Sequence, residues 1–124
     1  MLEAIVQYIK NNINSLIIGE NLFANHYPDS PDRIVSVIDA GGSPPPRYSP
    51  TGEKRFEIKF RVSNYSDGVD IGNQIMDLFQ NKENYQLGSF FILDSHALTD
   101  VTYLYTDKNN RDEFTFNLSF LIKK

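Results

Sequence analysis

The side chains best suited to chemistry stand together at Asp94-Ser95-His96, where a carboxylate, a hydroxyl and an imidazole follow one another. A hydrolytic triad, however, is assembled in space from residues distant in the sequence, not from neighbours at the end of a strand. His26 is the other histidine, and the chain has no cysteine, so ligands for a zinc site are too few. We therefore expect a surface loop here, with no catalytic residue, metal or cofactor.

Two further patterns suggest ligand sites, and both lack the required spacing. Gly41-Gly42 could cradle a phosphate, but proline follows, so no helix N-terminus is available to receive one. Asp29, Asp32 and Asp39 surround a turn and could bind calcium, but they lack the ligand spacing and the distal glutamate of a calcium loop. We expect a turn and solvated carboxylates.

Three cations, Arg55, Lys59 and Arg61, fall on one side of a predicted strand at residues 55–62. Polar and apolar residues alternate strictly in this stretch, which predicts one dry face and one wet, charged face. The dry face comprises Phe56, Ile58, Phe60 and Val62. The wet face is either a plain solvated surface or an electrostatic contact surface for a neighbouring subunit, and the residues alone leave both open.

The hydrophobic spacing also predicts the elements that position these residues. It predicts one amphipathic helix at about residues 2–13. It predicts a second that ends at about Lys82 and has Ser66 or Asp67 as its N-cap. Strands are predicted at 33–39, 55–62, 89–94, 101–106 and 113–123, with a short extended segment at 21–25 and a hairpin turn at 107–110. The expected fold is α+β, a mostly antiparallel sheet of about four to five strands packed with two helices.

One long Gly/Pro loop, residues 39–50, separates the second and third extended segments. Two glycines permit left-handed backbone angles, and three consecutive prolines stiffen the chain that follows into an extended arm. Loops of this length in a small protein are usually functional or disordered. Because the prolines restrict the free loop, ordering it against a partner costs less entropy.

Length and charge limit the classes of protein. The 124 residues suit one domain, 1–124. A net charge of −4 makes the chain a poor candidate for wrapping nucleic acid, which needs clustered lysine and arginine. No stretch approaches the roughly 20 apolar residues of a membrane-spanning helix, and the N-terminal residues lack the pattern of a signal peptide, so we expect no membrane partner.

Several short motifs follow one another along the chain in a recognisable order. Leu22-Phe23 precedes Pro28, a strand ends in Asp39-Ala-Gly-Gly-Ser-Pro44, and a charged strand ends in Arg61-Val-Ser-Asn-Tyr65 before a helix to Phe79. This order resembles the tail-terminator, or tail-completion, proteins of long-tailed bacteriophages, many of which are called minor capsid proteins. The resemblance extends over most of the chain.

The resemblance implies a non-enzymatic structural protein of the virion tail, assembled in the host cytoplasm. It implies a hexameric ring that caps the tail tube, ends its polymerisation and offers a docking surface to the head. The implied partners are further copies of the chain, the major tail tube protein and the head–tail connector, with DNA passing through without specific binding. We expect the contacts in the loop and on the charged strand face: Asp39, Gly41, Gly42, Pro44, Pro45, Pro46, Arg47, Tyr48, Arg55, Lys59 and Arg61.

Two other hypotheses belong to different classes. The chain could be a small intracellular adaptor that engages one partner through its Pro-rich loop and forms no ring. It could also be an enzyme with a cleft near Asp94–His96. A monomer at every concentration favours the adaptor, and hydrolytic activity lost in His96→Ala favours the enzyme.

Overall fold

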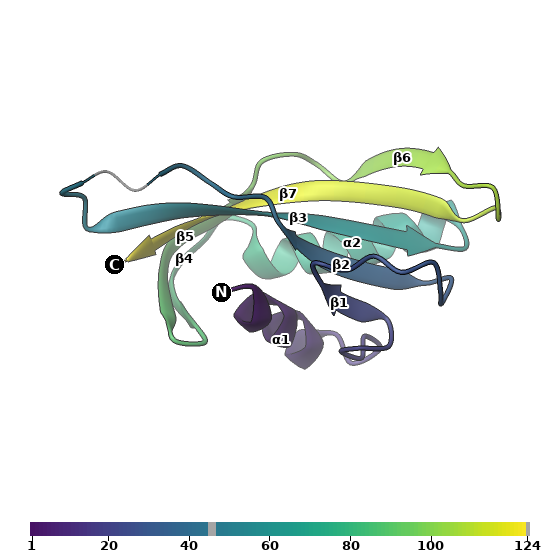
Figure 1. Ribbon diagram of the computed structural model, residues 1–124, viewed down its shortest axis with the longest axis horizontal. Helices are drawn as coiled ribbons and strands as arrows, with labels where there is room; N and C mark the ends of the chain where they lie inside the picture. Colours follow the sequence, from purple (N-terminus) through teal and green to yellow (C-terminus); the bar gives the residue numbers. More distant parts are fainter. Residues whose placement is uncertain (45–46, 124) are drawn as a thin grey trace.

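The computed structural model describes residues 1–44 and 47–123 (Figure 1). They form two helices and seven strands: α1 (Leu2–Asn12), β1 (Leu22–Ala24), β2 (Ile34–Asp39), β3 (Thr51–Val62), α2 (Tyr65–Phe79), β4 (Lys82–Leu87), β5 (Phe90–Ala97), β6 (Thr102–Thr106) and β7 (Asp112–Lys123). Among these residues, no helix is long and apolar enough to cross a membrane.

All seven strands join one mixed sheet. Six follow the order β1-β2-β3-β7-β5-β4, and β6 lies off this path and pairs with β7. The β1–β2 pair is parallel and every other pair is antiparallel. The α+β class is therefore confirmed, but the expected four to five strands were too few. The centre of the sheet is the β3–β7 pair, whose register runs without a break from Thr51↔Lys123 to Val62↔Asp112.

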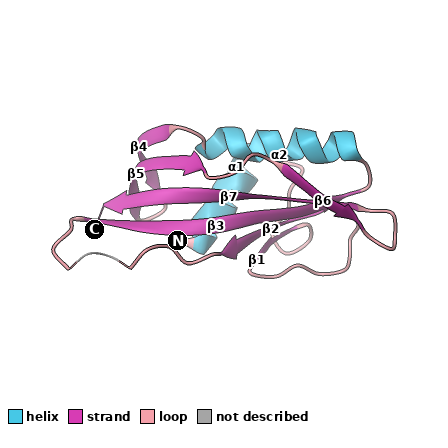
Figure 2. Cartoon of the chain, turned by 90° about the horizontal axis from the view of Figure 1, so that it is seen from above, coloured by secondary structure: helices cyan, strands magenta, loops and turns pink. Residues whose placement is uncertain are grey.

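Both helices cover the same face of this sheet (Figure 2). The alternation predicted for β3 is confirmed, because Phe56, Ile58, Phe60 and Val62 are at most 2% exposed. They meet the apolar residues of β7 and of the helices, and Tyr8 of α1 reaches Phe79 of α2 with ring centroids 5.4 Å apart. The core thus lies on one side of the sheet, and the opposite face is polar.

Helix α2 lies very close to the sheet because it presents glycine to the rings beneath it. A Cβ atom added at Gly68 would stand 2.1 Å from the ring of Phe114. The rings of Phe114 and Phe60 stack almost parallel, 5.3 Å apart. Any side chain at Gly68 would have to displace this stack from a densely packed core.

Several boundaries differ from those that the sequence predicts. The N-cap of α2 is Asn64, whose side chain accepts a hydrogen bond from the N–H of Asp67, and neither Ser66 nor Asp67 caps the helix. The helix ends at Phe79, and β4 begins at Lys82, where the helical pattern was expected to end. Strand β3 begins at Thr51 instead of Arg55 because its pairing with β7 continues through less patterned residues.

Candidate functional site

We call the Gly/Pro loop, residues 39–50, the arm. Its base continues the hydrogen-bond ladder between β2 and β3. The N–H of Ala40 donates to the carbonyl of Arg55, and the N–H of Arg55 donates to the carbonyl of Gly41, each at 2.9 Å. Gly42 has a φ of +137°, and a Cβ atom there would lie 2.4 Å from the Glu53 carbonyl oxygen. Only glycine allows the two backbones to pass this closely.

Glu53 fastens the arm to the sheet through hydrogen bonds from two hydroxyl groups. Ser43 donates to one carboxylate oxygen at 3.0 Å, and Ser119 of β7 donates to the other at 3.2 Å. Arg55 pairs with the same carboxylate at 3.1 Å. The hydrogen bond from Ser43 is the largest cause that holds the pKa of Glu53 below its usual value, so the tether and the ionised carboxylate favour each other.

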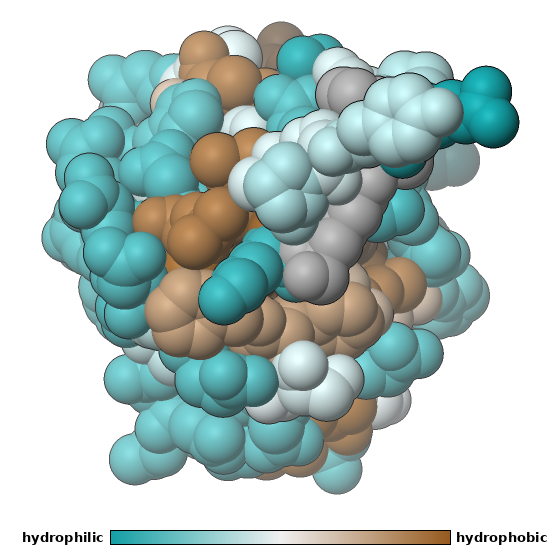
Figure 3. Space-filling model, turned by 90° about the vertical axis from the view of Figure 1, so that its left-hand side faces the viewer, coloured by the Kyte–Doolittle hydropathy of each residue, from teal (hydrophilic) through white to brown (hydrophobic). Residues whose placement is uncertain are grey.

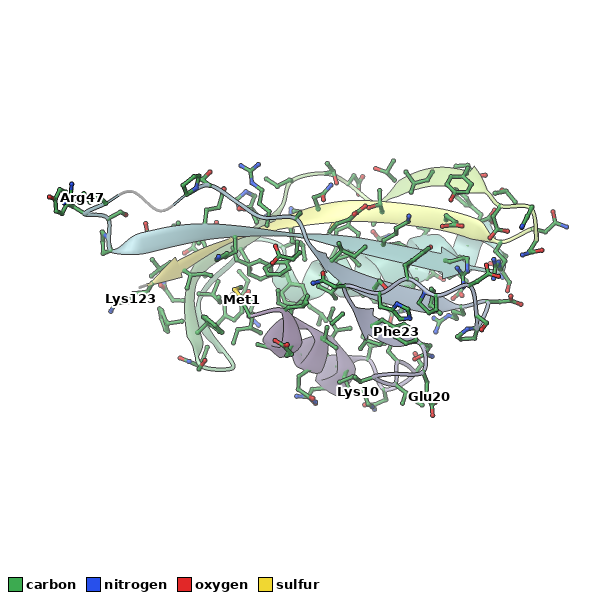
Figure 4. All side chains as sticks on the ribbon, in the orientation of Figure 1. Met1, Lys10, Glu20, Phe23, Arg47 and Lys123 are labelled. Carbon is green, nitrogen blue, oxygen red and sulfur yellow. The ribbon has the colours of Figure 1, made fainter. Side chains whose placement is uncertain are left out.

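Beyond this base the arm projects past the end of the sheet, and Figure 4 places Arg47 at one extreme of the long axis. Tyr48 is 88% exposed, and the guanidinium of Arg47 lies 5.4 Å from the centre of its ring. Figure 3 shows apolar side chains gathered on the surface beside the arm. Pro45 and Pro46, which we expected to take part in contacts, lie outside the described residues, so the extended polyproline form stays a prediction.

The three cations of β3 do not form one open charged surface. Arg55 is exposed and pairs with Glu53, and the ammonium of Lys59 lies 4.6 Å from the centre of the Tyr27 ring. Arg61 is 2% exposed, so the expectation that it faces solvent was wrong. Its guanidinium donates to the carbonyls of Pro31 and Asp32 at 2.7 and 3.3 Å and thus holds the loop of residues 25–33 over the sheet.

A second buried cation, Arg111, fixes the same loop from the β6–β7 hairpin. Its side chain is 7% exposed and pairs with Asp29 at 2.8 Å, Asp107 at 2.9 Å and Asp32 at 3.4 Å. It also donates to the carbonyl of Asp29 at 2.6 Å. The hydrogen bond to Asp29, the largest cause, raises the pKa of Arg111 above its usual value. Asp29 and Asp32 are thereby occupied by a cation, while Asp39 accepts from the N–H of Gly41.

A polar hollow of about 520 Å³ opens between this loop and the hairpin, and sequence reasoning missed it. Inside it the hydroxyl of Tyr27 donates to the buried carboxylate of Glu113 at 2.8 Å. Burial, followed by this hydrogen bond, raises the pKa of Tyr27. The hollow is lined by ten side chains that mostly pair with each other: Tyr27, Asp29, Lys59, Arg61, Tyr105, Thr106, Asp107, Lys108, Arg111 and Glu113. These pairs indicate a structural polar cluster.

The Asp94-Ser95-His96 stretch does not assemble a catalytic arrangement. His96 lies 3.0 Å from the carboxylate of Asp94. The hydroxyl of Ser95 is buried on the other side of β5, where it donates to the carbonyl of Phe79 and meets the hydroxyl of Tyr85, both at 2.7 Å. Burial raises the pKa of that Tyr85 hydroxyl to about 12. Alternation along the strand therefore separates the hydroxyl from the imidazole. This stretch lies in β5 and not in the surface loop that we expected.

Comparison with known proteins gives a family and a fold. A family model described as "Bacteriophage tail terminator protein" matches residues 8–124. No curated protein matches. One solved structure is similar over 98% of this chain and 89% of its own, with a TM-score of 0.62 and 9% sequence identity. At that identity the likeness shows the fold alone.

Proposed function

The chain belongs to the bacteriophage tail terminator family, and from that premise we propose that it caps the tail tube as a hexameric ring. In this role it ends polymerisation of the tube and offers the head connector a docking surface. The observation that carries the proposal is the family match over residues 8–124. This range includes all seven strands, the whole of α2 and the second part of α1. The family consists of structural tail proteins, and the separated Ser95 and His96 side chains agree with a role that involves no catalysis.

A ring imposes a requirement that this molecule can meet. Each copy in a cyclic ring needs two different surfaces, because its contact with the next copy is head-to-tail. The arm lies at one end of the long axis, and the β6–β7 hairpin lies at the other (Figure 1). We expect Asp39, Gly41, Gly42 and Pro44 to shape the arm, with Arg47 and Tyr48 making contact.

The charge of the chain suits a ring through which DNA travels. A net charge of −4 offers little attraction to phosphate, so DNA would pass without being held. Of the strand cations, Arg55 and Lys59 remain candidates for contact with the tube, whereas Arg61 would act indirectly by fixing the loop of residues 25–33. The proposed partners are other copies of the chain, the major tail tube protein and the head connector, which it meets in the host cytoplasm during assembly.

The first test is the mass in solution by light scattering after size exclusion, over a wide concentration range. It is paired with electron microscopy of tubes formed by the co-expressed tail tube protein. A hexamer, or tubes that end at a defined length with the protein at their tips, supports the proposal. A monomer at every concentration that also leaves tube length unchanged overturns it and favours the adaptor.

Deletion of residues 43–50 tests the arm within this function. The deletion should leave the circular dichroism spectrum unchanged, because the core residues lie outside this loop. It should abolish ring or cap formation. The control is Glu20→Ser, which removes an exposed charge from the turn between α1 and β1, away from both ends of the long axis. Normal assembly of the deletion variant would show that the arm makes no required contact.

A further inference from the structure

Among the described residues, strands β1, β4 and β6 each leave an edge of the sheet open, and β6 is the one that is exposed along its whole length. Proteins usually guard open edges by short length, charge or a backbone irregularity, since an open edge invites another strand. Strand β1 has three residues, and β4 carries Lys82, Glu83 and a left-handed Asn84 with φ +51°. Strand β6 reads Thr-Tyr-Leu-Tyr-Thr, bears no charge and is exposed at all five residues. Its one irregularity is a shift in its pairing with β7 between Tyr103 and Tyr105.

The exposed side chains of β6 rest on a firm support. Tyr103, Leu104 and Tyr105 are 42%, 41% and 49% exposed, and Tyr65 of α2, at 56%, stands 5.7 Å from the Tyr103 ring. Tyr103 and Tyr65 both pack on the buried ring of Phe114, at 5.6 and 5.5 Å. Tyr105 is paired with Glu113 on the polar face of the sheet and lines the hollow described above, so it does not share this surface. We call Tyr65, Tyr103 and Leu104 the β6 platform. It is preorganised, so binding to it orders few additional side chains.

The arm tip is the complementary exposed group. Tyr48 and Arg47 extend from one end of the long axis, while the β6 platform lies at the other end, so a chain cannot place its own tip on its own platform (Figures 1 and 4). Both surfaces are therefore available to another copy. Tyrosine and arginine are the side chains that most often dominate protein interfaces, and arginine stacks well on tyrosine rings.

Charge favours the same pairing. Residues 98–113 hold four acidic and two basic side chains. The two basic ones, Lys108 and Arg111, lie in the turn after β6. Residues 43–55 hold three basic side chains and one acidic side chain. Opposite charge at the two ends steers copies into head-to-tail contact and disfavours contact between like ends.

We propose that the β6 platform receives the arm tip, Tyr48 and Arg47, of a second copy of this chain. The contact is heterologous, so it propagates from copy to copy, and in the proposed ring the rotation between copies brings the last copy back to the first. This inference rests on the proposed function in one respect, that the ring supplies the neighbouring copy.

The absence of cysteine from the chain makes a direct test possible. Pro50→Cys and Thr102→Cys, which stand beside the two surfaces and leave their contact side chains in place, are prepared separately, mixed in equal amounts, and treated with a short bis-maleimide, both alone and with tail tubes present. Each position is exposed, so both variants should keep the native fold and thermal transition. We expect the mixed dimer to exceed either homodimer by about tenfold, because specific contact raises the local concentration of the two thiols.

Ile17→Cys is the matched control, because Ile17 is 45% exposed but belongs to neither surface. Paired with Pro50→Cys, it should give the statistical mixture of products. A statistical mixture for the 50–102 pair as well, both with and without tubes, overturns the contact. If tubes are nevertheless capped, the terminator function survives that result. Selective 50–102 linking with uncapped tubes supports the contact while contradicting the terminator function.

Discussion

Two proline-containing loops at opposite ends of β3 are held in opposite ways. The loop of residues 25–33 is drawn down onto the sheet by Arg61 and Arg111, two buried cations that bind its carbonyls and carboxylates. Within the part of the arm that the structure describes, the fastening lies at the base, through Gly42 and Glu53, and Tyr48 near the tip is exposed. The two sequences look alike as turns. What separates them is whether a buried donor lies beneath the loop.

Removing the cation beneath the fixed loop should have the largest effect on stability. Arg61→Met leaves the carbonyls of Pro31 and Asp32 without their donor, and we expect the free energy of unfolding in urea to fall by about 2–3 kcal/mol. Arg47→Met in the arm serves as the control and should change it by less than about 0.5 kcal/mol. Equal losses in the two variants would mean that the loops are not held differently.

The base of the arm should be the next most sensitive position. Gly42→Ala places a Cβ atom against the Glu53 carbonyl at φ +137°, which should lower the free energy of unfolding by about 2 kcal/mol. Gly41→Ala is the matched control, since its φ is +85° but no atom lies within 4 Å of the added Cβ, and it should cost about 1 kcal/mol. Chemical denaturation of both variants checks the order, and a reversed order would contradict the close approach.

Acid should loosen the arm base through Glu53. Its pKa is lowered in the folded protein, so its ionised form adds stability above its ordinary value of 4.5, and that contribution is lost as the pH falls through the folded pKa. The amide resonances of Gly42 and Ser43 should therefore shift below pH 4.5 in NMR spectra. Glu53→Gln should remove this titration, and a transition that persists in the variant would assign it to another group.

Changing the arm tip should have the smallest effect on stability. Tyr48→Ser removes a side chain that is 88% exposed, so the free energy of unfolding should change by less than about 0.5 kcal/mol. Ring or cap formation should nevertheless be lost if the tip makes the contact proposed above. Calorimetry and light scattering on the same sample separate the two effects, and a large loss of stability would show that the tip packs on its own chain.

Local patterns predicted the elements that lie in the centre of the fold. Strand β3 and α2 have clear periods of two and 3.6, and both are packed on the core as expected. Strand β4 was missed because an edge strand such as Lys82–Leu87 carries charge and a left-handed Asn84, and only its pairing with β5 makes it a strand.

The polar side of the sheet was harder to predict. The period of two placed Arg61 on the face opposite the core, which is correct, but its burial depends on a loop 30 residues away in the chain. Arg111 and Tyr27 gave no local signal either. The closest hint was the spacing of Asp107 and Arg111, which the structure joins as an ion pair four residues apart. Long-range polar contacts of this kind leave no periodic trace in the sequence.

The unbroken β3–β7 ladder has a geometric consequence for assembly. Its register runs through every residue of both strands, a span of about 40 Å at the usual rise per residue. It therefore acts as a stiff spacer between the arm and the β6–β7 hairpin. A closed ring tolerates little angular error, because the deviation of each copy adds to the mismatch at the last joint. In the ring that we propose, a stiff spacer would let the shape of one subunit set the number of copies.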